Sequence, residues 1–344
     1  MQKRIPWVDN CKAMAISSIV LGHLQSTPWL SEIIFEFILT AFFFVSGFTF
    51  ARSAETPFPK LIRKKFHSLI VPYFGFSAIL FAFWFIVRRN FGLICQSSDI
   101  SPLDTVLQIL CGVNSEVFIT PLWFLTCLFV TELFFWGQLR LKRGILTGIL
   151  ITELFILGIY YLTFVNAQQY SHIFWNLDRA CFYLYFLAAG FIAAKYGTIE
   201  KLFCSVKRDV WAVLVFAAIF TAAFVAQEKT STVWLILLLK VVMFNTGLLA
   251  FIGIAKLIPQ NKVLDFIGQN TLTILALHMI VQSLLRGVLF KVFHIAPESL
   301  QASLGISVLL ALITLAALVP AILLINRFMP RLAGKFPVAN KPSP

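Results

Sequence analysis

Long apolar stretches, separated by short polar segments, dominate the chain. A helix needs about 20 mainly apolar residues to cross the hydrocarbon core of a membrane. Stretches of about that length recur along the whole sequence and favour an all-α, polytopic integral membrane protein with about ten transmembrane helices. The expected spans are 10–27, 30–50, 68–88, 119–138, 144–165, 179–195, 209–227, 233–258, 271–292 and 303–328.

The segments between these spans are short, which predicts one domain rather than several. The longest runs over 89–118 and is polar, apart from a short amphipathic piece from Thr105 to Cys111. We therefore expect a single transmembrane domain over residues 1–330. The last residues, 331–344, are expected to form a short cytoplasmic tail.

Composition supports the same fold class. Of the 344 residues 59% are hydrophobic and only 12% are charged, and the mean hydropathy is +0.88. A soluble domain cannot keep that much apolar surface away from water, so the solvent of this chain is expected to be lipid. Residues 13–24 superficially resemble a signal peptide, but no A-x-A cleavage site follows, and we expect a retained first helix.

The net charge of +13 is interpreted as a topology signal rather than as a sign of nucleic-acid binding. Most of the 28 Lys and Arg residues fall on one side of the membrane if the N-terminus is cytoplasmic. By the positive-inside rule both termini are then expected in the cytoplasm, and an even number of spans is required. The predicted location is the cell (plasma) membrane, with lipids and no nucleic acid as partners.

The six cysteines are scattered and include no C-x-x-C pair, so no metal site is expected from them. Cys95 and Cys111 share the long segment that we place outside. They are either lone thiols or a disulfide in an oxidising compartment, and the sequence leaves this open.

The first span carries unusually many polar residues. Asp9 and Lys12 lie three positions apart, close enough on a helix to form an ion pair. His23 follows Lys12 by eleven positions, which is about three turns, so both side chains share one face about 16 Å apart along the axis. Ionisable groups within a span are costly and are therefore candidates for function. His23 could alternatively be an inert interfacial histidine.

Other spans also contain polar residues. His278 lies about seven residues into the ninth span, in the expected inner half of the bilayer, behind a possible helix cap at Asn270 and Thr271. It either takes part in chemistry or only fixes packing. Glu132 and Glu153, in the fourth and fifth spans, need partners there, and the neighbours of Glu153 are all apolar.

The densest group of cations occupies the expected loop 60–67, KLIRKKFH. One interpretation is a cytoplasmic anchor that contacts lipid headgroups. The other is a site for the phosphates of a cytoplasmic ligand, contacted by Arg63, Lys64 and Lys65. Composition alone favours the anchor.

Five segments, in order along the chain, resemble the membrane acyltransferase 3 family, in particular its fucose 4-O-acetylase-like sugar O-acetyltransferases. The first, in which the spacing from Lys12 to His23 is similar to the family's R-x10-H, includes Asp9. The segments are 4–23 (RIPWVDNCKA and VLGH at its two ends), 42–48 (FFFVSGF), the basic segment up to 71–73 (VPY), 121–125 (PLWFL), and 267–272 (IGQNTL) followed by His278.

Three positions depart from the family pattern. Lys12 stands where many members have Arg, which keeps the charge but loses bidentate geometry. Ser68 takes a place often held by Arg, and Thr271 replaces a usual Ser. These departures concern donor binding more than catalysis.

The resemblance implies transfer of an acyl group, most often acetyl, from acyl-CoA to a sugar hydroxyl of a cell-surface or lipid-linked glycan. His23 is then the expected catalytic residue, as a general base or as a carrier of the acyl group. Acetyl-CoA is a substrate in this reaction, and no bound cofactor or metal is expected. The expected donor-binding residues are Asp9, Lys12, Arg63, Lys64 and Lys65, and the expected supporting residues are Trp123, His278 and Ser46.

A transporter or flippase for a glycan or small anion is the alternative, since intramembrane histidines also serve as proton relays. The sequence lacks paired Gly- or Pro-broken spans in matching halves, which many transporters contain.

Overall fold

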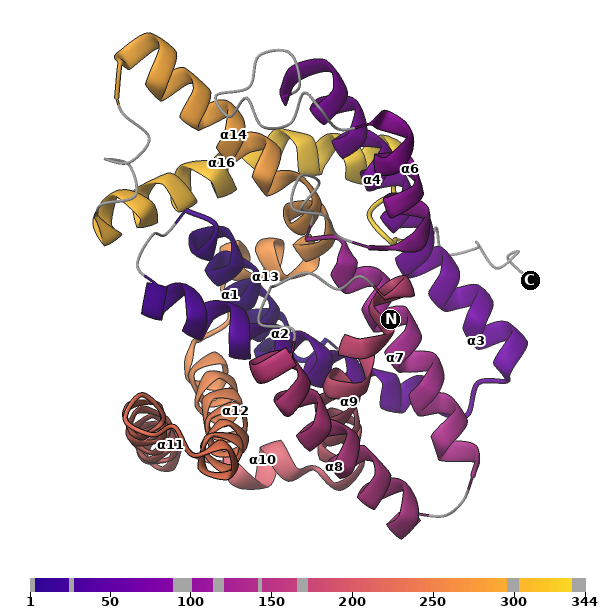
Figure 1. The fold of residues 1–344 in the computed structure, drawn as a ribbon, viewed down its shortest axis with the longest axis vertical. Helices are drawn as coiled ribbons and strands as arrows, with labels where there is room; N and C mark the ends of the chain where they lie inside the picture. The colour runs from indigo at the N-terminus through magenta and orange to yellow at the C-terminus, as the bar shows by residue number, and fades with distance from the viewer. Residues whose placement is uncertain are drawn as a thin grey trace, which may run out of the picture.

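The computed structural model describes residues 4–24, 28–88, 101–113, 121–141, 144–165, 173–295 and 303–335. Within these ranges the side chains at 28, 29, 31–37 and 88 are not described. All regular secondary structure in the described residues is helical (Figure 1). The expected all-α class is therefore confirmed for this part of the chain.

The described residues form α-helices along the whole chain. In the first half they are α1 (Pro6–Gly22), α2 (Pro28–Phe50), α3 (Phe58–Lys65), α4 (Val71–Phe83), α6 (Pro102–Cys111), α7 (Trp123–Arg140) and α8 (Gly144–Tyr160). In the second half they are α9 (Leu177–Tyr196), α10 (Thr198–Leu202), α11 (Val206–Gln227), α12 (Val233–Leu257), α13 (Lys262–Gln269), α14 (Thr271–Phe293) and α16 (Leu304–Phe328). Short 3₁₀ turns occupy Ala51–Ser53 and Phe174–Asn176, and π-helical turns occupy Phe66–Ile70, Trp84–Arg88 and Tyr161–Val165.

Seven helical segments of the described chain are long and apolar enough to cross a membrane. They are Phe58–Val87, Gly144–Val165, Phe174–Tyr196, Val206–Gln227, Val233–Leu257, Thr271–Phe293 and Leu304–Phe328. The other three expected spans coincide with α1, α2 and α7, which are helical where the sequence predicts them. The total of ten, and the cytoplasmic position of both termini, stay predictions.

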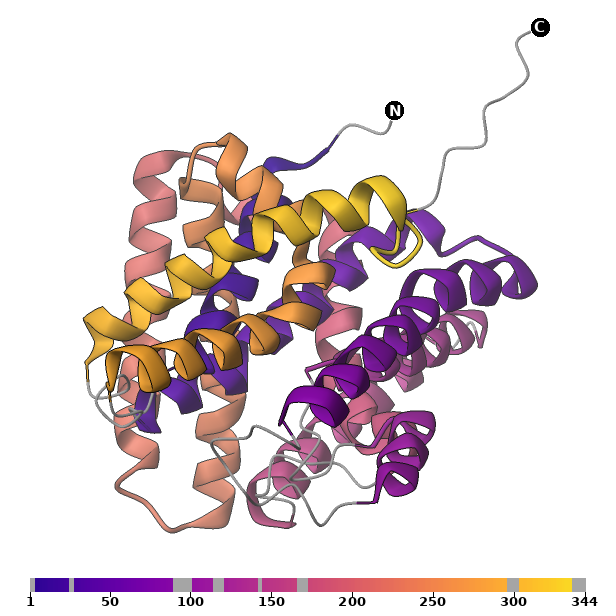
Figure 2. The ribbon, with the colours of Figure 1, turned by 90° about the horizontal axis from the view of Figure 1, so that it is seen from above.

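Helix α1 is the central element of the bundle. It packs against α2, α12, α13, α14 and α16, and eleven of its 17 residues are buried. Figure 2 shows α14 and α16 lying side by side and running obliquely across α1. The start of α1 and the end of α16 lie at the same end of the bundle (Figure 2), which we call the basic end because it carries Arg4 and Lys335.

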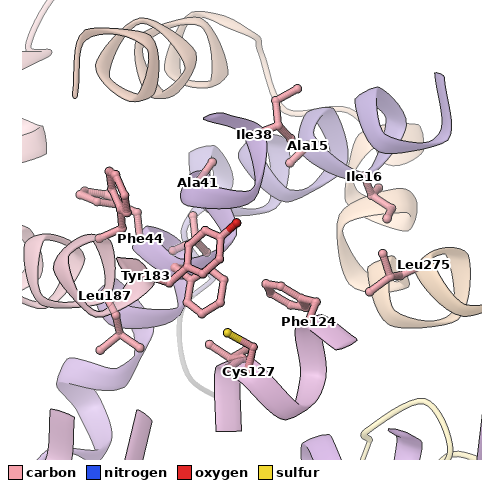
Figure 3. Close-up of a cluster of buried hydrophobic side chains, with 14 of the residues drawn as sticks. Ala15, Ile16, Ile38, Ala41, Phe44, Phe124, Cys127, Tyr183, Leu187 and Leu275 are labelled. Atoms are coloured by element: carbon pink, nitrogen blue, oxygen red, sulfur yellow. The ribbon is translucent and has the colours of Figure 1, made fainter. Parts of the chain in front are cut away.

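Aromatic and aliphatic side chains from five helices meet in the middle of the molecule. Figure 3 shows Ile16 of α1, Phe44 of α2, Phe124 of α7, Tyr183 of α9 and Leu275 of α14 converging on this cluster. The cluster joins helices that are far apart in sequence, so it fixes the position of α1 relative to α7 and α9.

Helices α2 and α9 approach each other so closely that only glycine fits at two positions. A Cβ atom added at Gly47 would collide with the backbone oxygen of Leu187, and one added at Gly190 would collide with that of Phe44. Small residues at such contacts let helix backbones pack directly, which is how membrane helices associate without a hydrophobic driving force. Next to this contact the ring of Phe43 stacks on Tyr183 with centroids 4.1 Å apart.

The prediction that the basic residues 60–67 form a loop is wrong, because these residues are helical. Phe58–Val87 forms one continuous helix of 30 residues, in which α3 carries the cations and α4 the apolar part. Pro59 lies in the first turn of α3, where its missing N–H costs no hydrogen bond. Pro72 has no N–H for the helix interior, and a π-helical turn at Phe66–Ile70 precedes it. The cationic segment is therefore the first part of the span.

Two smaller expectations concern segments outside the core. The amphipathic piece near 105–111 is helix α6, and Cys111 at its end is a free thiol, whereas Cys95 lies outside the described residues.

The described part of the expected tail, residues 331–335, packs back against the bundle, with Leu332 against the core and Lys335 bonded to Asn270 and Asn326. The domain boundary at residue 330 stays a prediction.

We predict that Gly190→Ala destabilises the protein, because the added methyl group forces α2 and α9 apart. Overpacking of this kind costs about 1–3 kcal/mol. Gly148→Ala in α8 is the matched control, since a Cβ atom added at Gly148 would have nothing within 4 Å. Alanine is the better helix former by about 1 kcal/mol, so this control is expected to keep or raise the melting temperature.

Thermal unfolding of both variants in detergent, followed by loss of the monodisperse chromatographic peak, measures the effect. Equal melting temperatures for Gly190→Ala and the unchanged protein would contradict the close α2–α9 contact.

Candidate active site

Three polar residues lie in the first half of α1. Asp9 and Lys12 form the ion pair expected from their spacing, with 2.7 Å between Asp9 Oδ1 and Lys12 Nζ. Asn10, which the sequence analysis did not single out, donates from Nδ2 to the carbonyl oxygens of Ala255 (3.1 Å) and Ile258 (2.9 Å). These carbonyls end α12 and lack partners within their own helix. Asn10 therefore fastens α1 to the end of α12.

Carbonyl groups at the end of α1 and in the two residues that follow it accept hydrogen bonds from side chains of other helices. Gln282 Nε2 donates to the oxygen of Val20 (2.9 Å), and Arg286 donates to the oxygen of His23 (2.8 Å). Ser307 of α16 donates to the oxygen of Leu24 (3.3 Å). Helix α1 has 17 residues, or about 25 Å, and is shorter than a typical 30 Å hydrocarbon core, so its end needs such partners within the protein.

This arrangement brings His23 and His278 together. Their ring centroids are 5.1 Å apart, with 39° between the planes. His278 is fully buried, whereas His23 is partly exposed. The two rings meet because α14 crosses α1 obliquely (Figure 2), so that its residues 278, 282 and 286 lie along the last turn of α1. The expected position of His278 in the inner half of the membrane stays a prediction.

The hydrogen bonds of His278 define its tautomer. Nδ1 lies 3.0 Å from the carbonyl oxygen of Ile274, and a carbonyl can only accept a hydrogen bond. The proton of the neutral ring is therefore on Nδ1, and Nε2 carries a free lone pair. Nε2 is buried and has no hydrogen-bond partner among the described residues. His278 thus offers a proton acceptor next to His23.

An apolar cavity of about 220 Å³, which we call the chamber, lies beside α1. Its wall is almost entirely aliphatic and aromatic, with Lys12 at one end. The residues that line it are Lys12, Ile16, Ile19, Leu39, Phe42, Val45, Ser46, Thr49, Leu69, Phe124, Leu125, Leu128, Thr271, Leu272 and Leu275. Ile19 and Leu275 are one helical turn before His23 and His278, so the chamber extends from Lys12 toward the histidine pair.

A second cavity of about 560 Å³, which we call the vestibule, lies at the basic end and shares Lys12, Thr49, Thr271 and Leu272 with the chamber. Its wall holds the cations of Arg4, Lys12, Arg52 and Lys335 and one carboxylate, Asp9, which is paired with Lys12. The four cations come from three segments that are far apart in sequence, at the start of the chain, after α2 and after α16. Together they give this cavity a positive potential next to the apolar chamber.

The basic wall is organised by Asn270. Its Oδ1 accepts hydrogen bonds from Lys335 Nζ and Asn326 Nδ2, both at 2.8 Å, and its Nδ2 donates to the oxygen of Phe266. Asn270 is the N-cap residue of α14, where the sequence predicts a cap, but its side chain makes no hydrogen bond to the first turn of α14. Burial, and secondarily the charge of Arg4, lower the pKa of Lys335.

The cations of α3 lie apart from both cavities. Lys65 Nζ lies 2.6 Å from Oε1 of Glu132, which is 1% exposed and also accepts from Ser46 Oγ at 2.9 Å. Lys64 Nζ donates a hydrogen bond to Ser53 Oγ (3.3 Å), and the side chain of Arg63 is exposed. Lys65 is therefore the partner that Glu132 needs within the span. Donor binding by Arg63, Lys64 and Lys65 stays a prediction, and none of the three lines the chamber or the vestibule.

The two remaining supporting residues occupy different positions. Ser46 lines the chamber as well as bonding Glu132. Trp123 lies at the start of α7, with the guanidinium of Arg179 4.5 Å from its ring centroid and the ring of Tyr183 6.2 Å away. The next two residues, Phe124 and Leu125, line the chamber, and Trp123 does not.

Sequence reasoning missed several residues that build this site. Arg4, Arg52 and Lys335 are single cations near the ends of spans, where the positive-inside rule already explains them. Gln282 and Arg286 follow His278 at intervals of four residues, and this shared face was the available signal. Gly268 was noted only as part of a motif. It lets α13 lie directly on α1, since a Cβ there would collide with the Asp9 backbone.

We predict that Lys65→Met strongly destabilises the protein. The substitution leaves Glu132 buried without a counter-charge, which typically costs about 3–5 kcal/mol. Lys64→Met is the matched control on the neighbouring exposed cation, and its effect is expected within about 0.5 kcal/mol. The melting temperature in detergent measures both. Adding Glu132→Leu to Lys65→Met is expected to restore part of the loss, and equal melting temperatures for the two single variants would contradict a structural ion pair.

Comparison with known proteins assigns the chain to a family. The model of the acyltransferase 3 family, which describes an acyltransferase domain, matches residues 5–325. No curated protein and no solved structure gives a significant match. The matched range covers most of the chain and contains α1, the chamber, the histidine pair and most of the vestibule. The chain therefore belongs to the acyltransferase 3 family and is a membrane acyltransferase.

Proposed function

We propose that this protein transfers an acyl group, in the first place acetyl, from acyl-CoA to a sugar hydroxyl of a cell-surface or lipid-linked glycan in the plasma membrane. The observation that carries the proposal is the order of two adjoining cavities: the basic vestibule shares part of its wall with the apolar chamber, whose lining reaches to one helical turn from His23 and His278. A charged entrance followed by an apolar passage suits a donor with a phosphate-rich head and an uncharged arm. The acetyl group and the glycan acceptor come from the resemblance to sugar O-acetyltransferases.

The vestibule is suited to the phosphates of CoA. Guanidinium and ammonium groups form charge-assisted hydrogen bonds with phosphate oxygens, about twice as strong as neutral ones. Among the described residues Arg4 and Arg52 have no ion-pair partner, and Lys335 is held by neutral asparagines. An anion bound here would reduce the repulsion between Arg4 and Lys335.

The chamber is suited to the uncharged part of the donor. Its wall excludes competing polar ligands, and its far end lies one turn from the histidines. The distance from Lys12 to His23 along α1, about 16 Å, gives room for an extended arm between phosphate and thioester. A dry passage also protects a thioester from water and strengthens electrostatic interactions within the site.

His23 is the proposed catalytic residue. Its imidazole takes the proton from the acceptor hydroxyl as the oxygen attacks the thioester carbonyl. The new C–O bond forms, the C–S bond breaks, and the thiolate of CoA receives the proton from His23. A covalent route, in which the His23 imidazole first accepts the acyl group, uses the same neighbours.

His278 is the proposed supporting residue. Its Nε2 lone pair is positioned to accept a hydrogen bond at the reaction centre, and its Nδ1–H is held by Ile274. Arg286 fixes the backbone of His23 through the hydrogen bond that it donates to the carbonyl oxygen of His23.

The transporter alternative is not favoured. Membership in an acyltransferase family accounts for the intramembrane histidines through group transfer, without requiring a proton relay.

We predict that His23→Ala abolishes acyl transfer and leaves the protein folded, whereas His278→Gln lowers the rate about 10²–10⁴-fold. The measurement is mass analysis of surface glycans from cells that express each variant, with membrane abundance determined in parallel. Leu21→Ala, a partly exposed neighbour on α1, is the matched control and is expected to retain acylation. Acylated glycans in cells carrying folded His23→Ala would overturn the assignment.

We predict that Arg4→Gln, Arg52→Gln and Lys335→Gln each weaken acetyl-CoA binding about tenfold, because each removes a charge-assisted contact worth about 1.5 kcal/mol or more. Arg63→Gln, in α3, is the control and is expected to bind normally. The dissociation constant of purified protein for labelled acetyl-CoA measures the effect. Weakened binding in Arg63→Gln alone would instead place the phosphates at α3, as the sequence first indicated.

A further inference from the structure

Ser46 of α2 is the one polar side chain, among the described residues of the chamber wall, that lies beyond the boundary with the vestibule. The other polar side chains of this wall are those of Lys12, Thr49 and Thr271, and all three also line the vestibule. The remaining described residues of the wall are aliphatic or aromatic. A ligand that has passed the boundary therefore meets a single hydrogen-bonding side chain of the described wall, the hydroxyl of Ser46.

The hydroxyl of Ser46 is oriented by Glu132. Ser46 Oγ lies 2.9 Å from Oε1 of Glu132, and Lys65 Nζ lies 2.6 Å from the same oxygen. A carboxylate that is paired with an ammonium group only accepts hydrogen bonds, so Ser46 donates its proton to Glu132. A serine hydroxyl has one proton and two acceptor lone pairs. The proton thus points to Glu132, and Ser46 can offer a ligand only its lone pairs.

These lone pairs are not used by the described part of the protein. No described residue donates to Ser46 Oγ, because the neighbouring hydroxyl of Thr49 donates to the Ser46 backbone oxygen instead (3.0 Å). A hydroxyl that donates to a carboxylate is polarised, which makes its oxygen the stronger acceptor in a chain of hydrogen bonds. Ser46 therefore suits a ligand group with an N–H or O–H and gives no hydrogen bond to a group that can only accept.

The position of Ser46 decides which part of a ligand can reach it. Thr49 belongs to both cavities, and Ser46 precedes it by three residues, about 4.5 Å along the axis of α2. Phe42 and Leu39 continue the same wall farther from the basic end. A ligand with its phosphates in the vestibule thus brings to Ser46 the part of its arm that is nearest to the phosphates.

We propose that Ser46 binds the pantetheine arm of acyl-CoA by accepting a hydrogen bond from the amide N–H that is nearer to the phosphates. This inference rests on the proposed function, in which the arm passes through the chamber. An N–H group that loses water and finds no acceptor weakens binding, and Ser46 supplies that acceptor. Glu132 acts as a positioning residue, because it holds the hydroxyl with its lone pairs free. The contact selects an arm with a donor at this point over an apolar chain of equal length.

Two ligands separate the arm from the phosphates in binding measurements on purified protein. Acetyl-CoA contains both, whereas adenosine 3′,5′-bisphosphate has the nucleotide and its phosphates without the arm. Ser46→Ala is expected to weaken acetyl-CoA binding about tenfold, as for other neutral hydrogen bonds, and to leave binding of the bisphosphate unchanged. Unchanged bisphosphate binding also shows that the variant is folded. Equal weakening of both ligands, or no weakening of either, would overturn the proposal.

Ser53→Ala is the matched control variant. Ser53 is a buried serine that accepts a hydrogen bond from Lys64, the neighbour of Lys65, and it lines neither cavity. This variant is expected to bind acetyl-CoA and the bisphosphate as the unchanged protein does. Acetyl-CoA binding weakened equally by Ser53→Ala and Ser46→Ala would count against a direct contact with the arm.

An altered ligand tests the same contact without changing the protein. In an acetyl-CoA analogue with an ester in place of the amide nearer to the phosphates, oxygen replaces the N–H. The unchanged protein is expected to bind this analogue about tenfold more weakly than acetyl-CoA, whereas Ser46→Ala is expected to bind the two ligands equally. Equal binding of both ligands by the unchanged protein would overturn the role of Ser46 alone. An unchanged protein that binds no acetyl-CoA would overturn the proposed function as well.

Discussion

The structure depends on how the short helix α1 ends within the protein. A helix leaves its last carbonyl groups without internal partners, and lipid offers none. Gln282, Arg286 and Ser307 supply them, so α14 and α16 must lie across the end of α1. This need for hydrogen bonds holds His23 in place and brings His278 against it.

The two cavities follow from the same arrangement. At its other end α1 is held by Asn10 on α12 and by the close contact of Gly268 with the Asp9 backbone. The face between these anchors is left free to line the chamber. Cations collect where the ends of α1, α2 and α16 meet, and the apolar wall begins directly beyond Lys12. A donor with an anionic head and an apolar arm finds its two environments in the correct order.

The ionisable residues of this structure occur in three different environments. Lys65 and Glu132 neutralise each other inside the protein, and the cost of burying them is offset by that pairing and by Ser46. The vestibule holds cations that exceed its carboxylates, which suits an anionic ligand. Glu153 lies on the exposed face of α8, with no hydrogen-bond or ion-pair partner among the described residues. The first two environments distinguish a structural ion pair from cations that suit a ligand, which their positions in the sequence do not.

The sequence by itself determined the helical fold class, the approximate span positions, the Asp9–Lys12 pair and the family, because hydropathy and local spacing are encoded within a few turns of one helix. It did not determine that residues 60–67 are helical, that Lys65 pairs with Glu132, or that Asn270 holds Lys335. Only the tertiary structure decided these, and also the contact of His23 with His278. Residues 60–67 are helical because they continue into the span Phe58–Val87, whereas the three contacts join residues more than 50 positions apart and depend on how their segments tilt and cross. Packing and hydrogen bonding set those crossings, and periodicity along one helix does not.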